Sequence, residues 1–336
     1  MPTKEITYIK YTILLFFCLT ASFLQAQEYD ITVAKDGSGD YVSIQEAFNS
    51  IPDFRKSITR IFLEPGTYKE KLTLASSKTN VHLIGNDASK TIITYDDYAS
   101  KKNKFGEELG TTGSSSFFVF GDGFVAKNIT FENSSGPVGQ AVAVRVDGDK
   151  VIFENCRFLG YQDTLYPHGK DSRQYYKNCY IEGTTDFIFG WSTAVFEGCE
   201  IFSKDGGSYI TAASTDKKSL HGFVFIKCKL TSDAPDKSVY LGRPWRDYAQ
   251  TIFISCEMGS HIKPEGWHNW EKPSAEENSF YAEFRSYGPG AAPDDRVMWS
   301  WQLTPDIAKA YTVQNVLGGE DDWNPIHVLQ GESEDQ

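Results

Sequence analysis

The sequence is poor in histidine and in positive charge, and these shortages exclude several classes of protein. Its 336 residues contain only 6 histidines, which form neither an HExxH pattern nor a cluster. We therefore expect no metal site, and no other cofactor is expected. Lys and Arg number 33 against 45 Asp and Glu, which gives a net charge of −12. A chain of that charge does not attract phosphate groups through its net field, so nucleic acid is not an expected partner.

Long hydrophobic runs are also absent, except near the N-terminus. Two lysines precede an apolar run at 11–24, and LQA closes it at residue 26. A run of about 14 residues is short for a membrane span, which needs ~20. The pattern predicts a signal peptide at 1–26 and one domain at 27–336, hence a secreted or periplasmic protein without a membrane contact after cleavage. Cleavage removes two lysines and one glutamate, so the net charge becomes −13, and we expect a monomer.

Cysteine is scarce, and its number is odd once the signal peptide is removed. Export normally favours disulfides, but five cysteines at one repeated position predict an interior stack of small apolar side chains. One or two disulfides between neighbouring copies of the repeat stay open as an alternative. The five residues are Cys156, Cys179, Cys199, Cys228 and Cys256.

These cysteines belong to an eight-residue unit that occurs six times, with isoleucine in place of cysteine in the first copy. The spacing varies between 20 and 29 residues while the unit itself stays constant, which is typical of a solenoid whose extra residues form loops on one side. Apolar residues alternate with a period of two, and the 3.6-residue period of a helical solenoid is absent. The sequence therefore predicts an all-β fold, a right-handed parallel β-helix built as a single-stranded solenoid with short capping helices. The units begin at residues 124, 151, 174, 194, 223 and 251.

Other positions of the unit predict how the coils bend and what covers them. Asn128, Asn155 and Asn178 share the fifth place, where asparagine tolerates the left-handed backbone of a sharp bend, so we expect a stacked asparagine ladder. The second place is apolar and would point outward on a bare coil. The chain from about residue 280 onward is the segment available to cover that face.

Both ends of the solenoid carry helix signals. Residues 31–51 predict a strand, a glycine-rich turn and a short helix that covers the unpaired strand edges at the open end. Residues 304–311 predict a second short helix, with Thr304 as its N-cap and Pro305 at the first helical position.

Two aspartates share one offset within the repeat. Asp163 follows Cys156 by seven residues, and Asp186 follows Cys179 by the same distance. In stacked coils this offset places the carboxylates on neighbouring strands, at about the ~4.8 Å strand spacing. A pair so close does not readily carry two charges. We therefore expect one carboxyl to keep its proton and act as a donor, while the other stays ionised as a nucleophile or base.

Five short stretches of the chain carry a resemblance to a known family: GTYKE (66–70), GQAVAVR (139–145), GYQDTLY (160–166), DFIFG (186–190) and LGRPW (241–245), with PEGW (264–267) as a further match. They resemble the signature stretches of the pectin methylesterases, carbohydrate esterases with a β-helix fold. They occur in the order of the family, and the resemblance extends over about residues 31–320. Two positions depart from the family: Val144 stands where leucine is usual, and Trp191 stands where asparagine is common.

The resemblance implies pectinesterase activity and a role for each matched residue. Asp186 would attack the C6 carbonyl of a methylated galacturonate and form an acyl-enzyme. Asp163 would protonate the departing methanol and then activate water. Gln140 and Gln162 would stabilise the oxyanion, with Gln140 also contacting substrate, and Arg243 would hold Asp186 ionised and contact substrate.

The resemblance also implies methyl-esterified homogalacturonan as the partner, bound along a cleft lined by aromatic rings. The net charge of −13 favours neutral, methylated stretches over the polyanionic product. Most of the many aromatic residues are expected to pack in the core. The expected substrate contacts are Trp245, Tyr166, Phe189, Tyr240, Trp267 and Thr111, the last from a loop that aligns poorly.

Three other functions suit a β-helix and stay open as alternatives. A polygalacturonase would pair its aspartates with His-Gly and Arg-Ile-Lys signatures, and Arg-Ile-Lys does not occur here. A calcium-dependent pectate lyase needs an acidic metal cluster, which the matched stretches do not supply. A non-catalytic polysaccharide-binding protein has no need to keep Asp163, Asp186 and Arg243 together. Methanol release without chain cleavage would separate the esterase from all three.

Overall fold

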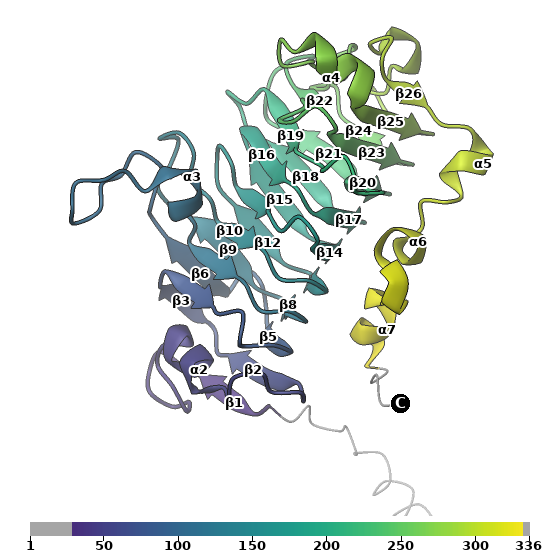
Figure 1. Ribbon diagram of the computed structural model, residues 1–336. Coiled ribbons are helices and arrows are strands. Elements are labelled where there is room, and N and C mark those ends of the chain that lie inside the picture. Colours follow the sequence, from purple (N-terminus) through teal and green to yellow (C-terminus); the bar gives the residue numbers. More distant parts are fainter. Residues whose placement is uncertain (1–28, 332–336) are drawn as a thin grey trace, which may run out of the picture.

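The computed structural model describes residues 29–331, which form a right-handed parallel β-helix (Figure 1). The predicted signal peptide lies outside the described residues. The central coils each contribute one strand to each of three parallel sheets, and the coils at the two ends contribute to fewer. The predicted fold class is therefore confirmed.

Sheet A has 11 strands, sheet B has 8 and sheet C has 7. The strands of sheet A are β1 Ile31–Val33, β2 Thr59–Leu63, β5 Val81–Gly85, β8 Val125–Lys127, β11 Val151–Glu154, β14 Arg173–Lys177, β17 Thr193–Glu197, β20 Phe223–Ile226, β23 Gln250–Ile254, β25 Phe280–Phe284 and β26 Trp301–Gln302. Those of sheet B are β3 Gly66–Lys69, β6 Thr91–Tyr95, β9 Thr130–Asn133, β12 Arg157–Leu159, β15 Tyr180–Gly183, β18 Glu200–Ser203, β21 Lys229–Ser232 and β24 Glu257–Met258. Those of sheet C are β4 Leu72–Leu74, β7 Phe117–Val119, β10 Val144–Val146, β13 Leu165–Pro167, β16 Thr185–Gly190, β19 Tyr209–Ala213 and β22 Tyr240–Gly242.

The repeat unit forms the corner between sheets A and B. Its fifth residue lies between the two strands and takes a left-handed backbone, with φ of 57° at Asn128, 53° at Asn155 and 51° at Asn178. Asparagine adopts this region more readily than most side chains, which is why it recurs at the corner. In later coils the same corner is made by Gly198 and Lys227, with φ of 62° and 52°. The predicted asparagine ladder is confirmed.

The five repeat cysteines line the interior as free thiols. All of them are buried, and none is paired in a disulfide. Each thiol donates to a backbone carbonyl of the preceding coil, as Cys228 Sγ does to the Phe196 oxygen at 3.3 Å. The predicted interior stack is confirmed, and of the two alternatives the structure adopts the reduced one.

Aromatic rings stack from coil to coil beside the cysteines. Phe153, Tyr176, Phe196, Phe225 and Phe253 occupy equivalent positions in five successive strands of sheet A. Neighbouring ring centroids lie 4.5–5.2 Å apart with interplanar angles of 4–13°. Because each stacked pair adds about 0.5–1.5 kcal/mol to simple burial, the column favours one register of the coils over a slipped one. That register also fixes the order of residues on the outer faces.

The N-terminal end is closed by helix α2, Ile44–Ser50, as predicted. Its N-cap Ser43 accepts from the backbone N–H of Glu46, and Ala47 and Phe48 are buried against the first coils. Glu70, from the matched stretch GTYKE, accepts hydrogen bonds from the Ser43 hydroxyl and the Ile44 N–H, at 2.6 and 3.0 Å. A carboxylate at a helix N-terminus is favoured by the helix dipole, so Glu70 is a structural residue.

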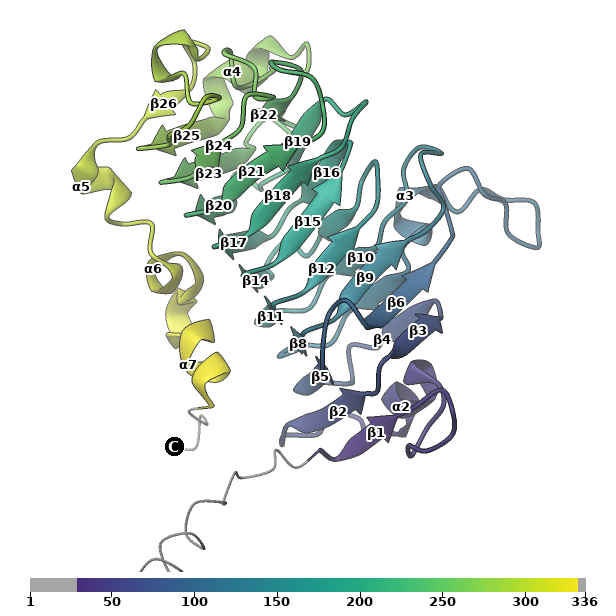
Figure 2. The same cartoon turned by 180° about the vertical axis from the view of Figure 1, so that it is seen from behind.

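The C-terminal segment covers the outer face of sheet A, as Figures 1 and 2 show in yellow. Helix α5 has Thr304 as N-cap, as predicted, but it is short and lies beside the solenoid rather than over its end. The apolar second-place residues of the repeat pack against Val316, Leu317 and Trp323, so the predicted covering is confirmed.

In residues 29–331 no helix is long and apolar enough to span a bilayer. The short helices after α2 are α3 Gly110–Gly113, α4 Pro273–Asn278, α5 Pro305–Ala308, α6 Val313–Leu317 and α7 Pro325–Gln330, with 3-10 turns at Pro293–Asp295 and Gly319–Asp321.

Candidate active site

The two aspartates lie on neighbouring coils of sheet C. Leu165 of β13 pairs with Ile188 of β16, and the Asp163 N–H donates to the Thr185 carbonyl at 3.1 Å. Asp163 and Asp186 each precede these paired residues by two positions. The predicted adjacency of the pair is therefore confirmed, with strands at the usual spacing of ~4.8 Å.

Local backbone distortion directs both carboxylates. Asp163 and Asp186 have left-handed backbones, with φ of 67° and 51°. The register of β16 against β19 also shifts between Thr185 and Ile188, so Asp186 lies in an irregularity of the strand. Bulges of this kind are common beside active sites because they turn a side chain out of the regular alternation.

Arg243 holds Asp186 by a two-pronged ion pair. Its Nε donates to Oδ1 at 2.9 Å and its Nη2 donates to Oδ2 at 2.6 Å. Arg243 follows β22, two coils beyond Asp186 in sheet C, so the contact depends on the stacking of the solenoid. Parallel hydrogen bonds from one guanidinium fix both the charge and the orientation of a carboxylate.

The surroundings of Asp163 and Asp186 shift the pKa values of the two carboxyls differently. Burial raises the pKa of Asp163 well above its usual range, and the negative charge of Asp186 raises it further. Burial also raises the pKa of Asp186, but the hydrogen bonds and positive charge of Arg243 oppose that effect. The two pKa directions favour the proton on Asp163 and the negative charge on Asp186, the division expected of a close carboxylate pair.

Two rings that the sequence did not single out enclose Arg243. The guanidinium carbon lies 3.9 Å from the ring centroid of Tyr209 and 3.7 Å from that of Trp270. Such stacking on both faces restricts the guanidinium to the plane that suits Asp186. Trp270 stands only three residues after the matched stretch PEGW, but nothing in its own neighbourhood marks it as different from a packing residue.

The two glutamines lie on coils next to the aspartates. Gln162 is half-buried and directly precedes Asp163, whereas Gln140 is exposed in the loop before β10. The Ala141 N–H donates to the Gln162 carbonyl at 3.1 Å, which places both glutamines on neighbouring coils. Within residues 29–331 neither side-chain amide has a hydrogen-bond partner, so both sets of N–H donors are available to a ligand.

Aromatic rings gather on the same face. Tyr166 and Phe189 stack at 4.0 Å, and each is only 4% exposed. The half-buried ring of Trp245 is tilted over them, at 6.2 and 5.9 Å between centroids. The structure thus brings the three predicted residues together. Tyr166 and Phe189 form a buried layer, and Trp245 lies over it with part of its ring exposed to solvent.

Of the other expected substrate contacts, Tyr240 and Thr111 lie near the site, whereas Trp267 does not. Tyr240 is half-buried and stacks on Tyr209 at 5.3 Å, one ring away from Arg243. Thr111 is half-buried in α3, and its backbone carbonyl accepts a hydrogen bond from the Ser114 hydroxyl. That hydroxyl in turn accepts a hydrogen bond from the Val142 N–H. Both therefore lie at the edges of the site.

The sugar contact expected of Trp267 is wrong. Its ring is 1% exposed and packs in the core between Phe253 and Tyr281, at 5.9 and 4.3 Å between centroids. A ring so enclosed has no face left for a sugar, and its role is to fill the last coils.

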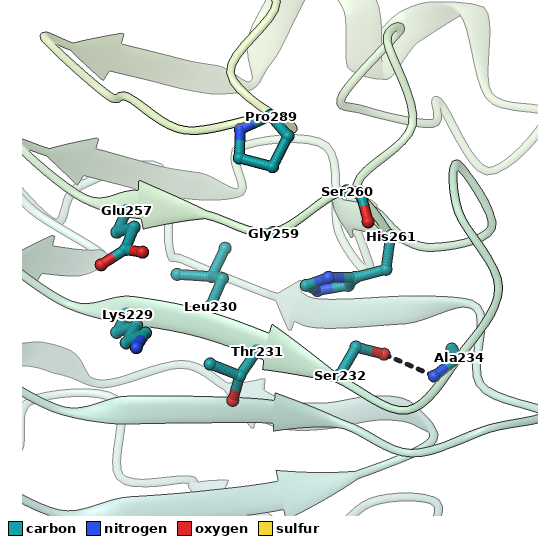
Figure 3. A pocket seen from close by; sticks show the side chains of 10 residues that line it. All are labelled: Lys229, Leu230, Thr231, Ser232, Ala234, Glu257, Gly259, Ser260, His261 and Pro289. Carbon is teal, nitrogen blue, oxygen red and sulfur yellow. Dashed lines mark hydrogen bonds between the residues drawn. The ribbon is translucent and has the colours of Figure 1, made fainter.

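A separate pocket of about 270 Å³ lies on sheet B (Figure 3). Lys229 and Glu257 stand on its strands, and His261 lies at one end. Burial lowers the pKa of His261 to about 4, so the imidazole is neutral at neutral pH. The pocket contains neither member of the aspartate pair. In residues 29–331 no group of three or more His, Cys, Asp or Glu is arranged to hold a metal ion.

Comparison with known sequences gives one family. The family model named Pectinesterase matches residues 30–320. Pectinesterase 31 of Arabidopsis thaliana is 40% identical over 298 residues, which cover 87% of this chain and 93% of that protein. The pectinesterase of Petunia integrifolia is 38% identical over 308 residues, covering 87% and 80%. Some relatives are longer: the chain spans 50% of the probable pectinesterase/pectinesterase inhibitor 13 of Arabidopsis thaliana, at 38% identity and 91% coverage of this chain.

Solved structures agree with that result. A pectin methylesterase from carrot superimposes with a TM-score of 0.79 at 34% identity, covering 88% of this chain and 95% of its own. A pectin methylesterase in complex with a hexasaccharide superimposes with a TM-score of 0.77 at 30% identity, covering 89% and 99%.

Proposed function

This chain belongs to the pectinesterase family, and we propose that Asp186 and Asp163 perform its ester hydrolysis as nucleophile and acid/base. The protein is a pectinesterase, which removes methyl esters from the galacturonate units of pectin. The observation that carries the proposal is the two-pronged Arg243–Asp186 pair beside Asp163, a buried carboxyl whose pKa is raised by burial and by the charge of Asp186. It supplies a fixed anion next to a proton donor, and acyl transfer to a carboxylate requires both.

In the first half of the reaction, an Asp186 oxygen attacks the C6 carbonyl of the methylated sugar. A bond forms between Oδ and C6, and the electron pair of the C6–OCH₃ bond leaves with the methoxy group. The proton of Asp163 passes to that oxygen, so methanol departs as a neutral molecule. The result is an anhydride between Asp186 and the sugar, and Asp163 is left ionised.

In the second half, Asp163 takes a proton from water as the water oxygen bonds to C6. The C6–Oδ bond breaks and Asp186 returns as a carboxylate paired with Arg243. The sugar leaves with a free carboxyl group, and Asp163 is protonated again for the next cycle. Both steps pass through an oxyanion at the C6 oxygen, which the unpaired amides of Gln162 and Gln140 would stabilise without adding charge.

The remaining roles follow the arrangement of the aromatic face. Trp245 would stack on a sugar ring above the buried layer of Tyr166 and Phe189, while Tyr240 and Thr111 would contact substrate at the edges. The substrate is methyl-esterified homogalacturonan, a long chain that needs an open face. We place the enzyme outside the cytoplasm, because residues 1–26 are predicted to be a signal peptide. The catalytic domain would then be residues 27–336, acting as a monomer.

A methanol-release assay on methylated pectin tests the function. The protein should release methanol without producing new reducing ends or unsaturated products. New reducing ends would indicate a glycosidase and unsaturated ends a lyase, while binding without any product would indicate a polysaccharide-binding protein.

The rate should depend on pH through both carboxyls. Asp186 must be ionised to attack, so activity falls as pH decreases through its pKa. Asp163 must be protonated to release methanol, so activity falls as pH rises through its pKa, which burial has raised well above the usual carboxyl range. Measuring kcat against pH for the wild type and for Asp163→Asn tests this assignment. The variant should be slow and should lack the alkaline limb, and an unchanged alkaline limb would assign that limb to another group.

Removing the ring of Trp270 should loosen Arg243 and slow the reaction. A cation–π contact contributes about 0.5–2 kcal/mol, so Trp270→Leu should lower kcat roughly 2- to 30-fold. Trp270→Phe keeps an aromatic face and should recover most of the loss. Equal losses in the leucine and phenylalanine variants would show that stacking on Arg243 is not the role of this residue.

A further inference from the structure

The side chain of Lys272 extends from the start of α4 to the segment that carries Arg243. Its Nζ donates to the backbone carbonyls of Pro244 and Trp245, at 3.2 and 3.0 Å. The N–H groups of this segment are bonded to β19, as the Arg243 N–H is to the Thr211 carbonyl at 3.0 Å. Within residues 29–331 no backbone N–H donates to the two carbonyls that the lysine binds. The ammonium therefore satisfies acceptors that the strand pairing leaves without a donor.

The same lysine contacts the turn that carries Trp270. Its Nζ lies 4.8 Å from the ring centroid of Trp270, and this ring is the one that stacks on the Arg243 guanidinium at 3.7 Å. Trp270 and Glu271 both have left-handed backbones, which side chains other than glycine rarely adopt, so the turn depends on the contacts around it. The backbone of Lys272 is itself fixed, because its carbonyl accepts from the Ala275 N–H of α4 at 2.9 Å. Lys272 thus joins two parts of the chain that both determine where Arg243 lies.

Charge alone does not explain why a lysine stands at this position. Among residues 29–331 no acidic side chain lies within ion-pair distance of the Lys272 Nζ. Burial lowers the pKa of Lys272 below its usual value, and the positive charge of Arg246 lowers it further. The charge of Asp247 opposes this effect, and that of Arg243 adds to it. An ammonium beside two guanidinium groups is disfavoured by its neighbours, so its hydrogen bonds to the two carbonyls are the contacts that retain it there.

We propose that Lys272 is a positioning residue for the ester hydrolysis: its ammonium fixes the Arg243 segment against Trp270. The guanidinium is thereby kept in the orientation that pairs with both oxygens of Asp186. The inference rests on the proposed function, and Lys272 acts through Arg243 rather than on the substrate. Without the ammonium the segment stays anchored to β19 through its N–H groups but gains freedom at its carbonyls. The guanidinium then pairs with Asp186 for a smaller part of the time, and fewer encounters with substrate have the nucleophile correctly oriented.

Kinetics of Lys272→Met and Lys272→Arg test the inference. Methionine keeps most of the length of the side chain and removes its charge and its donors. The kcat for methanol release should fall about 3- to 30-fold, because water only partly replaces the ammonium, while KM should change less than about threefold. The acid limb of kcat against pH should also move to higher pH, since a loosened Arg243 lowers the pKa of Asp186 less. Arginine keeps the positive charge and N–H donors, so it should restore most of kcat and the position of the acid limb.

Lys78→Met is the matched control. The Lys78 ammonium also donates to a backbone carbonyl, that of Ile51, and it pairs with Asp53, but it does so at the N-terminal end of the solenoid. This variant makes the same change of charge and should lower Tm without changing kcat, KM or the acid limb.

Three results would overturn the inference. They are a normal kcat of Lys272→Met with or without a lower Tm, an acid limb that does not move, and equal losses in the methionine and arginine variants. Each of them leaves methanol release by the wild type intact, so the proposed function would stand. Failure of the wild type to release methanol would instead overturn the proposed function itself.

Discussion

Replacing Asp186 with alanine is expected to lower turnover on the order of 10⁴-fold or more, as happens when a nucleophile acting together with its partners is removed. The variant retains Asp163, both glutamines and the aromatic face, so substrate binding should persist. What is lost is the oxygen that bonds to C6, and a water molecule in its place lacks both its charge and its fixed position. The measurement is kcat for methanol release at the pH optimum of the wild type.

The fold should survive this change. Arg243 loses its partner, but it remains stacked between Tyr209 and Trp270, and its side chain is 17% exposed. The contrast is Glu283→Ala, because Glu283 and Arg296 form an ion pair whose side chains are only 3% and 2% exposed. Leaving Arg296 unpaired should cost about 3–5 kcal/mol of unfolding free energy, with normal turnover in the folded fraction. Near-normal turnover of Asp186→Ala would refute the nucleophile role.

Removing the amide of Gln162 should lower turnover about 10²–10³-fold, or ~3–4 kcal/mol, with a much smaller effect on KM. The reason is that its N–H donors have no partner in the folded protein and would gain one only as the C6 oxygen becomes negative. Gln302→Ala, which removes an exposed amide on β26, should change neither constant.

The glutamate variant at the same position separates charge from size. Gln162→Glu keeps the length of the side chain but places a third carboxylate beside Asp163 and Asp186, where it repels the developing oxyanion. It should be at least as damaging as the alanine variant. If both variants raise only KM, Gln162 positions the substrate and the oxyanion is stabilised by another group.

The sequence allowed the pairing of the aspartates to be predicted because the solenoid ties position in the repeat to position in space. Asp163 and Asp186 share an offset from Cys156 and Cys179, and stacking of the coils converts that offset into adjacency. The same reasoning placed the asparagine ladder and the covered face of sheet A. These features depend on a period that is visible in the residues themselves.

Features outside the repeat were harder to predict. Trp267 follows β24 in a segment without the repeat's alternation, so its matched stretch did not reveal that the ring faces the core. Trp270 was missed for a related reason: it and Glu271 have left-handed backbones, with φ of 56° and 57°, and only this bend brings the ring onto Arg243. The redox state of the cysteines also required the structure, because neighbouring coils are close enough for either form.

The most direct test of the roles given to the two aspartates is chemical trapping of the acyl-enzyme. Enzyme and methyl-esterified oligogalacturonate are mixed with hydroxylamine and quenched during turnover, and the peptides are mapped by mass spectrometry. Attack of hydroxylamine on the aspartyl carbonyl of the anhydride leaves a hydroxamate on the nucleophile. The mechanism predicts this modification at Asp186, dependent on substrate and absent from Asp163. Modification of Asp163 with Asp186 unchanged would contradict it.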